Sequence, residues 1–327
     1  MKKMVIKGTG RYLPDRIVTN DDLAKFMDTS DEWIQQRTGI EERRWVPEEG
    51  HIGSSDLGLE ASKIALDRAG WVPEDLDLII FATLSPDLFF PGSGCLLQSK
   101  LGLKSTPAID IRQQCTGFLY GFEMADAYIK SGYANKILVV GAEVHSSGLD
   151  MSTRGRDVTV IFGDGAGAVC VEGVETDENV GLLATSLHAQ GDYAEALMTE
   201  APASRNQPRL TKEDFDAGKH FPTMDGKKVF KLAVRRLPEV TQKVLDKAGL
   251  TMDDIDMVIP HQANLRINQF YQKSMGIPDE KIYNNIQKYG NTTAGTLPIA
   301  LDEIIEKKLI SPEKSTIIFS GLGAGVT

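Results

Sequence analysis

The chain has 327 residues, with 36 Lys and Arg against 46 Asp and Glu, a formal net charge of −10, and 41% hydrophobic residues. This length predicts two structural units that could each bury a core. The acidic balance argues against a general nucleic-acid binder, because phosphate neutralisation needs a basic surface. No apolar run approaches the roughly 18 residues of a membrane helix, and the start MKKMVIKGTG lacks an apolar signal region. With only three cysteines, no disulfide framework is expected, so we expect a reduced, cytoplasmic compartment and no membrane span.

An internal repeat is the most informative feature of the sequence. Residues 66–80 read LDRAGWVPEDLDLII, and residues 245–259 read LDKAGLTMDDIDMVI, 179 residues further on. A Gly-rich segment closes each half, GDGAGAV at 163–169 and GLGAGVT at 321–327. Two echoes in the same order predict two related halves, which we place at residues 1–172 and 173–327.

Both halves alternate apolar runs with helical patterns. Continuous apolar runs, typical of parallel strands covered on both faces, occupy 77–83, 136–141, 256–260 and 315–320. Helices are expected between them, for example at 118–130 and 297–307. This pattern predicts an α/β fold with covered sheets. Reactive groups in such folds collect beyond the carboxyl ends of strands.

Cys115 and His261 stand at such strand ends. Cys115 follows the run PAIDIR and opens a helical pattern, and His261 follows IDMVIP and opens another. A thiol at a helix N-terminus meets unpaired N–H groups, which favour the nucleophilic thiolate. Cys95 and Cys170 are instead interpreted as inert packing residues.

Asn291 lies in the Gly-flanked turn KYGNTTAG, ahead of the helix that begins near Leu297. Adding the repeat offset to Cys115 leads to residue 294, within this same turn. Two pseudo-symmetric halves would therefore bring the two turns face to face, with His261 beside them. We expect no metal site, because the sequence has no HExxH motif, no paired CxxC and no carboxylate spaced to His261 as a ligand set.

Four segments together resemble one family of enzymes. In order and spacing, they resemble the β-ketoacyl-acyl carrier protein synthase III enzymes of type II fatty acid synthesis. The four segments are IRQQCTGFLYGFEMADAYIKSG, STRGRDVTVIFGDGAGAV, VIPHQANLRI and KYGNTTAGTLPIALDE. The resemblance runs from GTGRYLP to the final GAGVT. It implies the thiolase fold, a five-layered αβαβα sandwich built from two similar halves.

The resemblance also implies a reaction. Cys115 would take an acyl group from an acyl-CoA, and malonyl-acyl carrier protein would lose CO₂ and attack that thioester, which initiates a fatty acid chain as a 3-ketoacyl product. His261 and Asn291 would donate hydrogen bonds to the malonyl thioester oxygen. The backbone N–H groups of Cys115 and Ala324 would hold the acyl oxygen. Coenzyme A thioesters enter as substrates, and no permanently bound cofactor is implied.

Further residues match family positions that bind substrates and partners. Trp33 and Arg154 would sandwich the adenine of coenzyme A, with Arg37 near its phosphates. Phe90 would reach into the acyl pocket of a partner subunit, which implies a homodimer. The pantetheine tunnel would be lined by Phe230 and Ala263.

An acyl carrier protein would dock on a basic surface. Residues 205–236 contain nine Lys and Arg against four acids, a local excess that would steer an acidic partner. Pro238 should kink or divide the helix that carries these charges. The docking residues implied are Lys231, Arg235, Gln262, Asn264, Leu265 and Arg266, and Lys227 stands where the family often has Asn.

Other functions were weighed against this one. A dinucleotide-dependent oxidoreductase would explain GDGAG, but that segment lacks the context of a first strand-to-helix turn. A non-catalytic scaffold would have no reason to carry Cys115, His261 and Asn291 together. A thiolase-fold enzyme that transfers the acyl group to oxygen or nitrogen, or condenses two long acyl chains, could carry all three and stays open.

Overall fold

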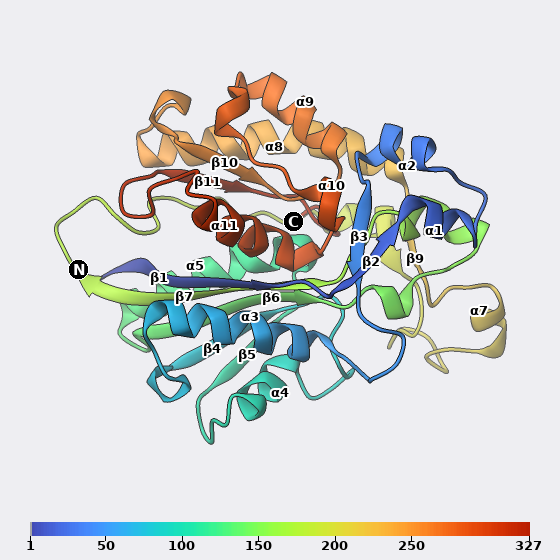
Figure 1. The fold of residues 1–327 in the computed structure, drawn as a ribbon, viewed down its shortest axis with the longest axis horizontal. Coiled ribbons are helices and arrows are strands. Elements are labelled where there is room, and N and C mark those ends of the chain that lie inside the picture. Colours follow the sequence, from blue (N-terminus) through green and yellow to red (C-terminus); the bar gives the residue numbers. More distant parts are fainter. Residues whose placement is uncertain (1) are drawn as a thin grey trace.

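The computed structural model describes residues 2–327 and has five layers, visible in Figure 1. The first sheet has five strands in the order β1-β7-β6-β4-β5. Strand β4 runs parallel to β5 and β6, whereas β7 runs antiparallel to β1 and β6. The bounds are β1 (Lys2–Tyr12), β4 (Leu78–Ala82), β5 (Ala108–Ile111), β6 (Lys136–Glu143) and β7 (Gly165–Glu175).

Helices cover both faces of this sheet. On its outer face lie α3 (Ser54–Ala69) and α4 (Ser93–Lys100), and on its inner face lie α5 (Gly117–Ser131) and α11 (Thr296–Glu306). Every residue of β4 is buried, as expected for a strand covered on both sides.

A second sheet lies beyond α5 and α11. Its parallel strands are β10 (Met257–Pro260) and β11 (Ile317–Ser320), and its outer cover is α8 (Gly226–Ala248) and α9 (Leu265–Met275). One buried cluster joins side chains of both sheets through α5 and α11, including Ile80, Phe118 and Ile259. The layers therefore follow the order αβαβα, which confirms the predicted sandwich.

The repeat read from the sequence recurs in the backbone. Gly70 and Gly249 end corresponding helices with φ of 68° and 67°, a left-handed conformation that glycine adopts without strain. Short 3₁₀ turns at Gln114–Thr116 and Thr293–Gly295 each lead into an inner helix. Their first residues, Gln114 and Thr293, both have positive φ, 47° and 49°.

The division of the chain into 1–172 and 173–327 stays a prediction. Strand β7 passes through residue 172 and ends at Glu175. The two Gly-rich echoes also differ in structure, because GDGAGAV runs into β7 whereas GLGAGVT forms a loop after β11.

A cap of short elements stands at one end of the sandwich, on the right in Figure 1. Its buried Arg43 donates to the carbonyl oxygens of Val18 and Val160 and to Asn20 Oδ1, and burial lowers the pKa of Arg43 to about 10. The cap and its neighbours comprise β2 (Arg16–Thr19), α1 (Asn20–Ala24), α2 (Asp31–Thr38), β3 (Glu42–Trp45), α6 (Arg156–Thr159), β8 (Leu197–Thr199), α7 (Lys212–Asp216), β9 (Pro222–Met224) and α10 (Ile286–Tyr289).

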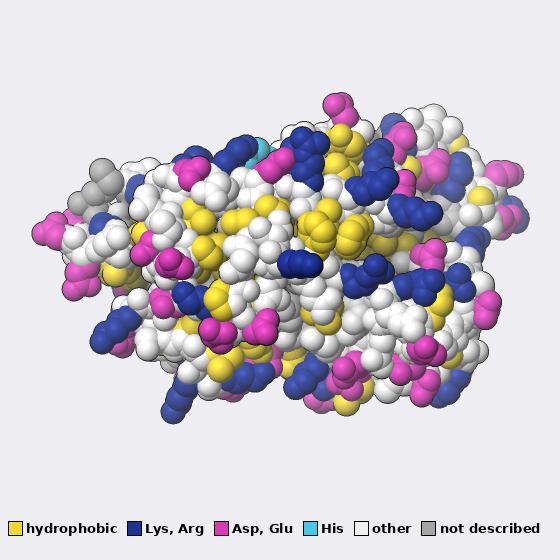
Figure 2. All heavy atoms as spheres, turned by 90° about the horizontal axis from the view of Figure 1, so that it is seen from above, with side chains coloured by type: hydrophobic (Ala, Val, Ile, Leu, Met, Phe, Trp, Pro, Cys, Tyr) yellow, Lys and Arg dark blue, Asp and Glu magenta, His cyan; other side chains and the backbone are white. Residues whose placement is uncertain are grey.

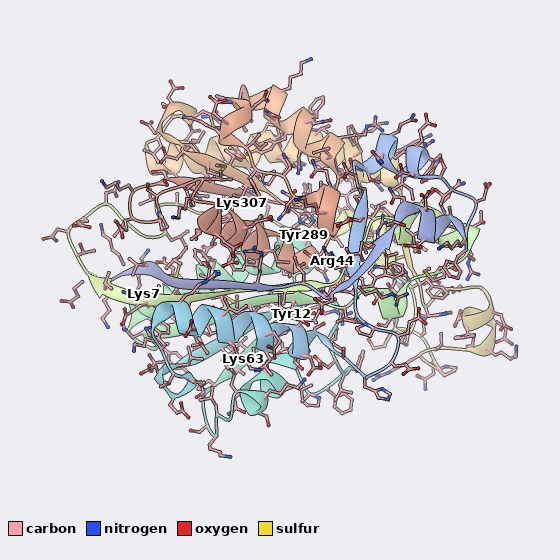
Figure 3. All side chains as sticks on the ribbon, viewed as in Figure 1. Lys7, Tyr12, Arg44, Lys63, Tyr289 and Lys307 are labelled. Atoms are coloured by element: carbon pink, nitrogen blue, oxygen red, sulfur yellow. The ribbon has the colours of Figure 1, made fainter. Side chains whose placement is uncertain are left out.

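Charged side chains tie α11 to the first sheet. Asp302 is 1% exposed and accepts from Thr9 Oγ1 at 2.7 Å, and it pairs with Arg11 and Arg68. The charged residues of this group line a hollow whose rim includes Tyr12, Arg44 and Tyr289, all labelled in Figure 3.

Two expectations about single residues are wrong. Helix α8 is one helix of 23 residues that continues through Pro238, so proline does not divide it. Ala233, Leu237, Thr241 and Leu245 form a buried stripe along α8, and this packing holds the helix together across the missing N–H. Cys95 is exposed rather than packed, whereas Cys170 is fully buried.

Candidate active site

Cys115 lies in the 3₁₀ turn between β5 and α5 and is 6% exposed. The C-terminal loop covers it, since a β-carbon on Gly323 would lie only 3.1 Å from Cβ of Cys115. The backbone N–H groups of Cys115 and Ala324 both approach the sulfur. These are the two donors that the sequence analysis paired.

Burial of the Cys115 thiol opposes the ionisation that a helix N-terminus favours. Burial, followed by the charge of Glu143, raises the pKa of Cys115 to about 12, although the two backbone N–H groups oppose the shift. Loss of hydration disfavours a buried anion more than the helix end favours it.

His261 follows β10 directly and is 4% exposed. Its Nδ1 lies 2.7 Å from Thr296 Oγ1, and its buried Nε2 has no hydrogen-bond partner among the described residues. Burial lowers the pKa of His261 to about 3, so the imidazole is neutral at physiological pH. When the Thr296 hydroxyl donates to Nδ1, the ring proton resides on Nε2, which faces the cavity as a donor.

The backbone of Asn291 is held by the neighbouring segment 161–163, and its side chain is held by its own turn. Its backbone N–H donates to the Ile161 carbonyl at 2.9 Å, and its carbonyl accepts from Gly163 N–H at 3.1 Å. Its Oδ1 accepts from Thr293 N–H at 2.8 Å. The Nδ2 group is therefore the donor that remains for a ligand.

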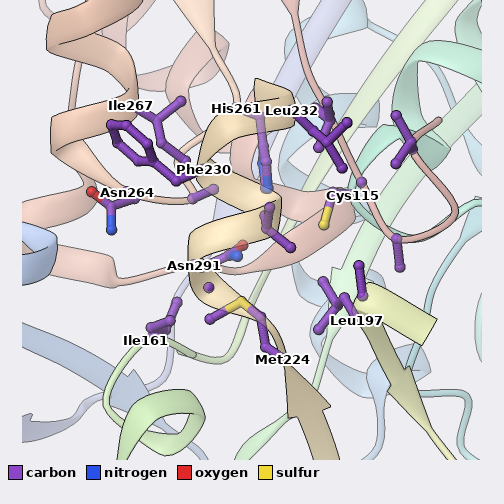
Figure 4. Close-up of a pocket in the computed structure, with 18 of the residues that line it drawn as sticks. Cys115, Ile161, Leu197, Met224, Phe230, Leu232, His261, Asn264, Ile267 and Asn291 are labelled. Atoms are coloured by element: carbon purple, nitrogen blue, oxygen red, sulfur yellow. The ribbon is translucent and has the colours of Figure 1, made fainter. Parts of the chain in front are cut away.

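The structure brings the three predicted residues to one cavity of about 120 Å³. Figure 4 shows the Cys115 sulfur, the His261 ring and the Asn291 carboxamide directed toward the same space. Most of the remaining wall is apolar, and the predicted Phe230, Ala263 and Ala324 are part of it. A thiol and two neutral donors around an apolar cavity suit acyl transfer followed by stabilisation of an enolate oxygen.

Trp33, Arg37 and Arg154, which were predicted to bind the adenine and phosphates of coenzyme A, lie outside this cavity. The Arg37 guanidinium lies 4.1 Å from the Trp33 ring centre. The second arginine over Trp33 is Arg156, at 4.6 Å, whereas the predicted Arg154 pairs with Asp150 at 2.6 Å. Arg156 therefore lies directly over the Trp33 ring, and the role of Arg154 on the other side of a bound adenine stays a prediction.

The predicted docking residues divide by exposure. Gln262 is 1% exposed and makes only internal hydrogen bonds, including one to the Pro260 carbonyl at 2.6 Å, so its predicted contact with a carrier protein is wrong. Asn264 caps α9 by accepting from Arg266 N–H at 2.9 Å, and Leu265 packs against Gly39.

Three basic members of the predicted docking set are exposed, namely Lys231, Arg235 and Arg266. Lys227, at the start of α8, is exposed too. In Figure 2 Lys and Arg side chains lie around a patch of hydrophobic side chains on the face that carries α8 and α9. A cationic surface with an apolar centre suits an acidic protein partner.

Phe90 projects from the loop after β4 and is 78% exposed, and its neighbours Leu88 and Phe89 are also exposed. Three adjacent exposed apolar side chains are typical of surfaces that take part in protein–protein contacts.

Three residues buried around the turns of Cys115 and Asn291 were not predicted from the sequence, namely Glu143, His145 and Thr296. Thr296 could have been found as the first residue of the helix after Asn291. Nothing in the linear sequence signals Glu143, because it ends an ordinary apolar strand.

Residues 2–327 contain neither a cluster suited to a metal ion nor a helix suited to a membrane. No cluster of three or more His, Cys, Asp or Glu side chains could hold a metal ion. Over the same residues, every helix is too short or too polar to cross a bilayer.

Comparisons with known proteins agree with this site. Residues 109–191 match the family model of 3-oxoacyl-[acyl-carrier-protein] synthase III, and residues 245–327 match the model of its C-terminal part. The synthase III of Natranaerobius thermophilus is 43% identical, covering 100% of this chain and 98% of the relative, and that of Caldanaerobacter subterraneus is 44% identical, covering 98% and 95%. The crystal structure of synthase III from Aquifex aeolicus is 42% identical with a TM-score of 0.88, covering 100% of this chain and 97% of that one. The chain therefore belongs to the β-ketoacyl-[acyl-carrier-protein] synthase III family, which are acyl-transferring condensing enzymes with the thiolase fold.

Proposed function

We propose that this chain takes an acyl group from an acyl-CoA onto Cys115 and condenses it with malonyl-acyl carrier protein to give a 3-ketoacyl-acyl carrier protein, the first step of fatty acid chain growth. The observation that carries this proposal is the single cavity lined by Cys115, His261 and Asn291. The match to synthase III relatives over the full chain supports it.

In the first half-reaction the Cys115 sulfur attacks the acyl thioester carbon. The new S–C bond forms as the bond to the coenzyme A sulfur breaks, and the thiol proton passes to the departing thiolate. The N–H groups that approach the Cys115 sulfur come from Cys115 and Ala324, and they stabilise the oxyanion of the tetrahedral intermediate. Because burial raises the pKa of the thiol, its proton must leave as the S–C bond forms.

In the second half-reaction malonyl thioester replaces coenzyme A. Loss of CO₂ leaves an enolate whose oxygen accepts hydrogen bonds from His261 Nε2–H and Asn291 Nδ2–H. The enolate carbon attacks the acyl-Cys115 thioester, which releases the 3-ketoacyl product and a Cys115 thiolate that takes a proton from solvent. Removing one such donor costs about 10²–10³ in rate.

Substrate recognition is proposed to use the surface around the cavity. Trp33, flanked by Arg37 and Arg156, offers a stacking face and positive charge for the adenine and phosphates of coenzyme A. Phe230 and Ala263 would contact the pantetheine arm. Lys231, Arg235 and Arg266 would receive acyl carrier protein.

A homodimer is proposed from the exposed apolar loop at 88–90. Phe90 would enter the acyl pocket of the partner subunit. Sedimentation velocity would show a dimer for the wild type and monomer for Phe90→Glu. The control is Phe26→Glu, at another exposed phenylalanine, 61% exposed, which would stay dimeric.

The central experiment separates condensation from simple acyl transfer. The protein is incubated with a panel of acyl-CoA lengths and malonyl-acyl carrier protein, and CO₂ release and the mass of Cys115 are measured. We expect an adduct on Cys115 alone, none on Cys95 or Cys170, none in Cys115→Ser, and CO₂ release that depends on the acyl-CoA. Acyl transfer without decarboxylation would refute the proposal in favour of an acyltransferase acting on another nucleophile, which the synthase III relatives do not favour.

A further inference from the structure

Glu143 and His145 lie at the end of β6, behind the cavity wall, and have no part in the reaction described above. Glu143 has no exposed surface and His145 is 9% exposed. Neither residue lines the cavity. Both nevertheless contact the turn that carries Asn291.

The Glu143 carboxyl joins two segments that are far apart in the chain. On one side it accepts from the N–H groups of Leu84 and Ser85, each at 3.0 Å, and from the Ser85 hydroxyl at 2.6 Å. On the other side it accepts from Ala294 N–H at 3.4 Å. One buried side chain therefore connects the loop that leads to Phe90 with the turn that follows Asn291.

His145 reaches the same turn by another route. Its Nε2 lies 2.6 Å from Thr293 Oγ1, and its ring centre packs 4.5 Å from that of Phe162. Thr293 in turn donates its N–H to Asn291 Oδ1 at 2.8 Å. His145 thus acts on the Asn291 carboxamide through Thr293, which is held at positive φ.

The strand and the turn are in close contact. A β-carbon on Gly141 would collide with the Ala294 carbonyl oxygen, so only glycine permits this approach. With no space between them, a change at the end of β6 displaces the turn rather than being absorbed by a gap.

We propose that Glu143 and His145 are positioning residues that hold the Asn291 turn in its donor geometry. Glu143 also links this turn to the loop before Phe90. This inference rests on the proposed condensation. Neither residue touches the substrates. A displacement of about 1 Å in a catalytic group can cost as much as 10²-fold in rate.

The charge of Glu143 supplies a second, independent readout. The groups that face its carboxyl are uncharged donors from Thr83, Leu84 and Ser85 on the loop and from Ala294 on the turn. Burial raises the pKa of Glu143 to about 7, and its negative charge is a cause of the raised pKa of the Cys115 thiol. Removing that charge lowers the thiol pKa, which a purely structural role would not do.

The test uses Glu143→Gln and His145→Ala. The control is Glu172→Gln on the neighbouring strand β7, where Glu172 pairs with Lys7 at 3.7 Å. Three quantities are measured: the acyl adduct on Cys115, CO₂ release from malonyl-acyl carrier protein, and the rate of Cys115 alkylation by iodoacetamide against pH. We expect CO₂ release to fall about tenfold or more in both variants while Cys115 is still fully acylated. The alkylation profile should move to lower pH in Glu143→Gln alone, and Glu172→Gln should match the wild type.

Unchanged CO₂ release in both folded variants would overturn the positioning role, as would equal losses of acylation and CO₂ release. An unmoved alkylation profile in Glu143→Gln would overturn the electrostatic link. If Glu143→Gln does not fold, Ser85→Ala is tested in its place. We expect a smaller loss of CO₂ release in Ser85→Ala, and unchanged CO₂ release in this variant would count against the proposal. A wild type without CO₂ release would instead refute the proposed function, and the alkylation profiles would still be readable.

Discussion

The imidazole Nδ1 of His261 lies 2.7 Å from the hydroxyl oxygen of Thr296, the first residue of α11. The same hydroxyl lies 3.0 Å from the Thr293 carbonyl oxygen. Its single proton can go to only one of these acceptors at a time, and only donation to Nδ1 leaves the His261 proton on Nε2, where the cavity needs a donor. The tautomer of His261 is therefore coupled to the choice of acceptor by the Thr296 hydroxyl, which donates to the Thr293 carbonyl when Nδ1 carries the ring proton.

Thr296→Val should therefore impair decarboxylation more than acylation. Valine keeps the branched shape but cannot donate to Nδ1, so Nε2 loses its preference for carrying the proton. We expect CO₂ release to fall by about 10–10², with acylation of Cys115 unchanged. Thr296→Ser keeps the hydroxyl and should retain most of the activity, and a loss in Thr296→Ser equal to that in Thr296→Val would contradict the explanation.

The pH dependence of Cys115 alkylation should reflect a protonated resting thiol. With a pKa raised to about 12 by burial, the thiolate fraction grows about tenfold per pH unit through the neutral range. Stopped-flow alkylation by iodoacetamide should show a rate that rises steadily with pH and reaches no plateau below about pH 9. A plateau near neutrality would show a thiolate stabilised in the free protein.

Acid should destabilise the fold partly through His261. The pKa of this residue is lowered to about 3 by burial, against an ordinary value near 6.5. The unfolded chain therefore binds the proton more readily, so stability is present above the unfolded pKa and is lost as pH falls toward the folded pKa. Urea unfolding of His261→Asn should show a smaller loss of stability than the wild type between about pH 7 and pH 5. Parallel losses in the two proteins would count against this assignment.

Arg156 rather than Arg154 should affect the use of coenzyme A thioesters. Arg156→Ala removes a guanidinium from the Trp33 stack, so we expect KM for acyl-CoA to rise about tenfold with little change in kcat. Arg154→Ala, two positions away and paired with Asp150, is the matched control and should leave KM within about twofold. The reverse pattern would favour the predicted role of Arg154 over that of Arg156.

Asp302 should matter for stability. Its buried carboxylate neutralises Arg11 and Arg68, so Asp302→Ala leaves two guanidinium groups without their buried partner. We expect a loss of about 3–5 kcal/mol in the free energy of unfolding, measured by urea denaturation. Glu306→Ala removes a side chain that pairs with Arg11 but is 52% exposed and should cost about 1 kcal/mol or less.

Local patterns were sufficient to predict buried strands in two related halves and the three catalytic candidates, whereas the five layers were implied by the family resemblance. Apolar runs predicted strands β4, β6, β10 and β11, and the repeat offset predicted that the turn at Cys115 would meet the turn at Asn291. Both inferences use information that lies within a few residues or at a fixed spacing.

What the sequence did not reveal depends on contacts between distant segments. The raised pKa of Cys115 comes from burial under the loop that contains Gly323, which no local pattern measures. The pairing of Arg154 with Asp150 and the position of Arg156 over Trp33 also depend on tertiary packing. Gln262 lies next to the active-site histidine in sequence, yet its side chain turns inward to bond the backbone.

The matching bends at Gln114 and Thr293 must come together during folding before the active site exists. The nucleophile is supplied by one bend and the carboxamide by the other, and the lid over the sulfur comes from the last residues of the chain. A fragment containing either bend alone would hold half of the reaction centre open to water. Activity therefore requires both bends and the loop at Gly323 to be assembled around Cys115.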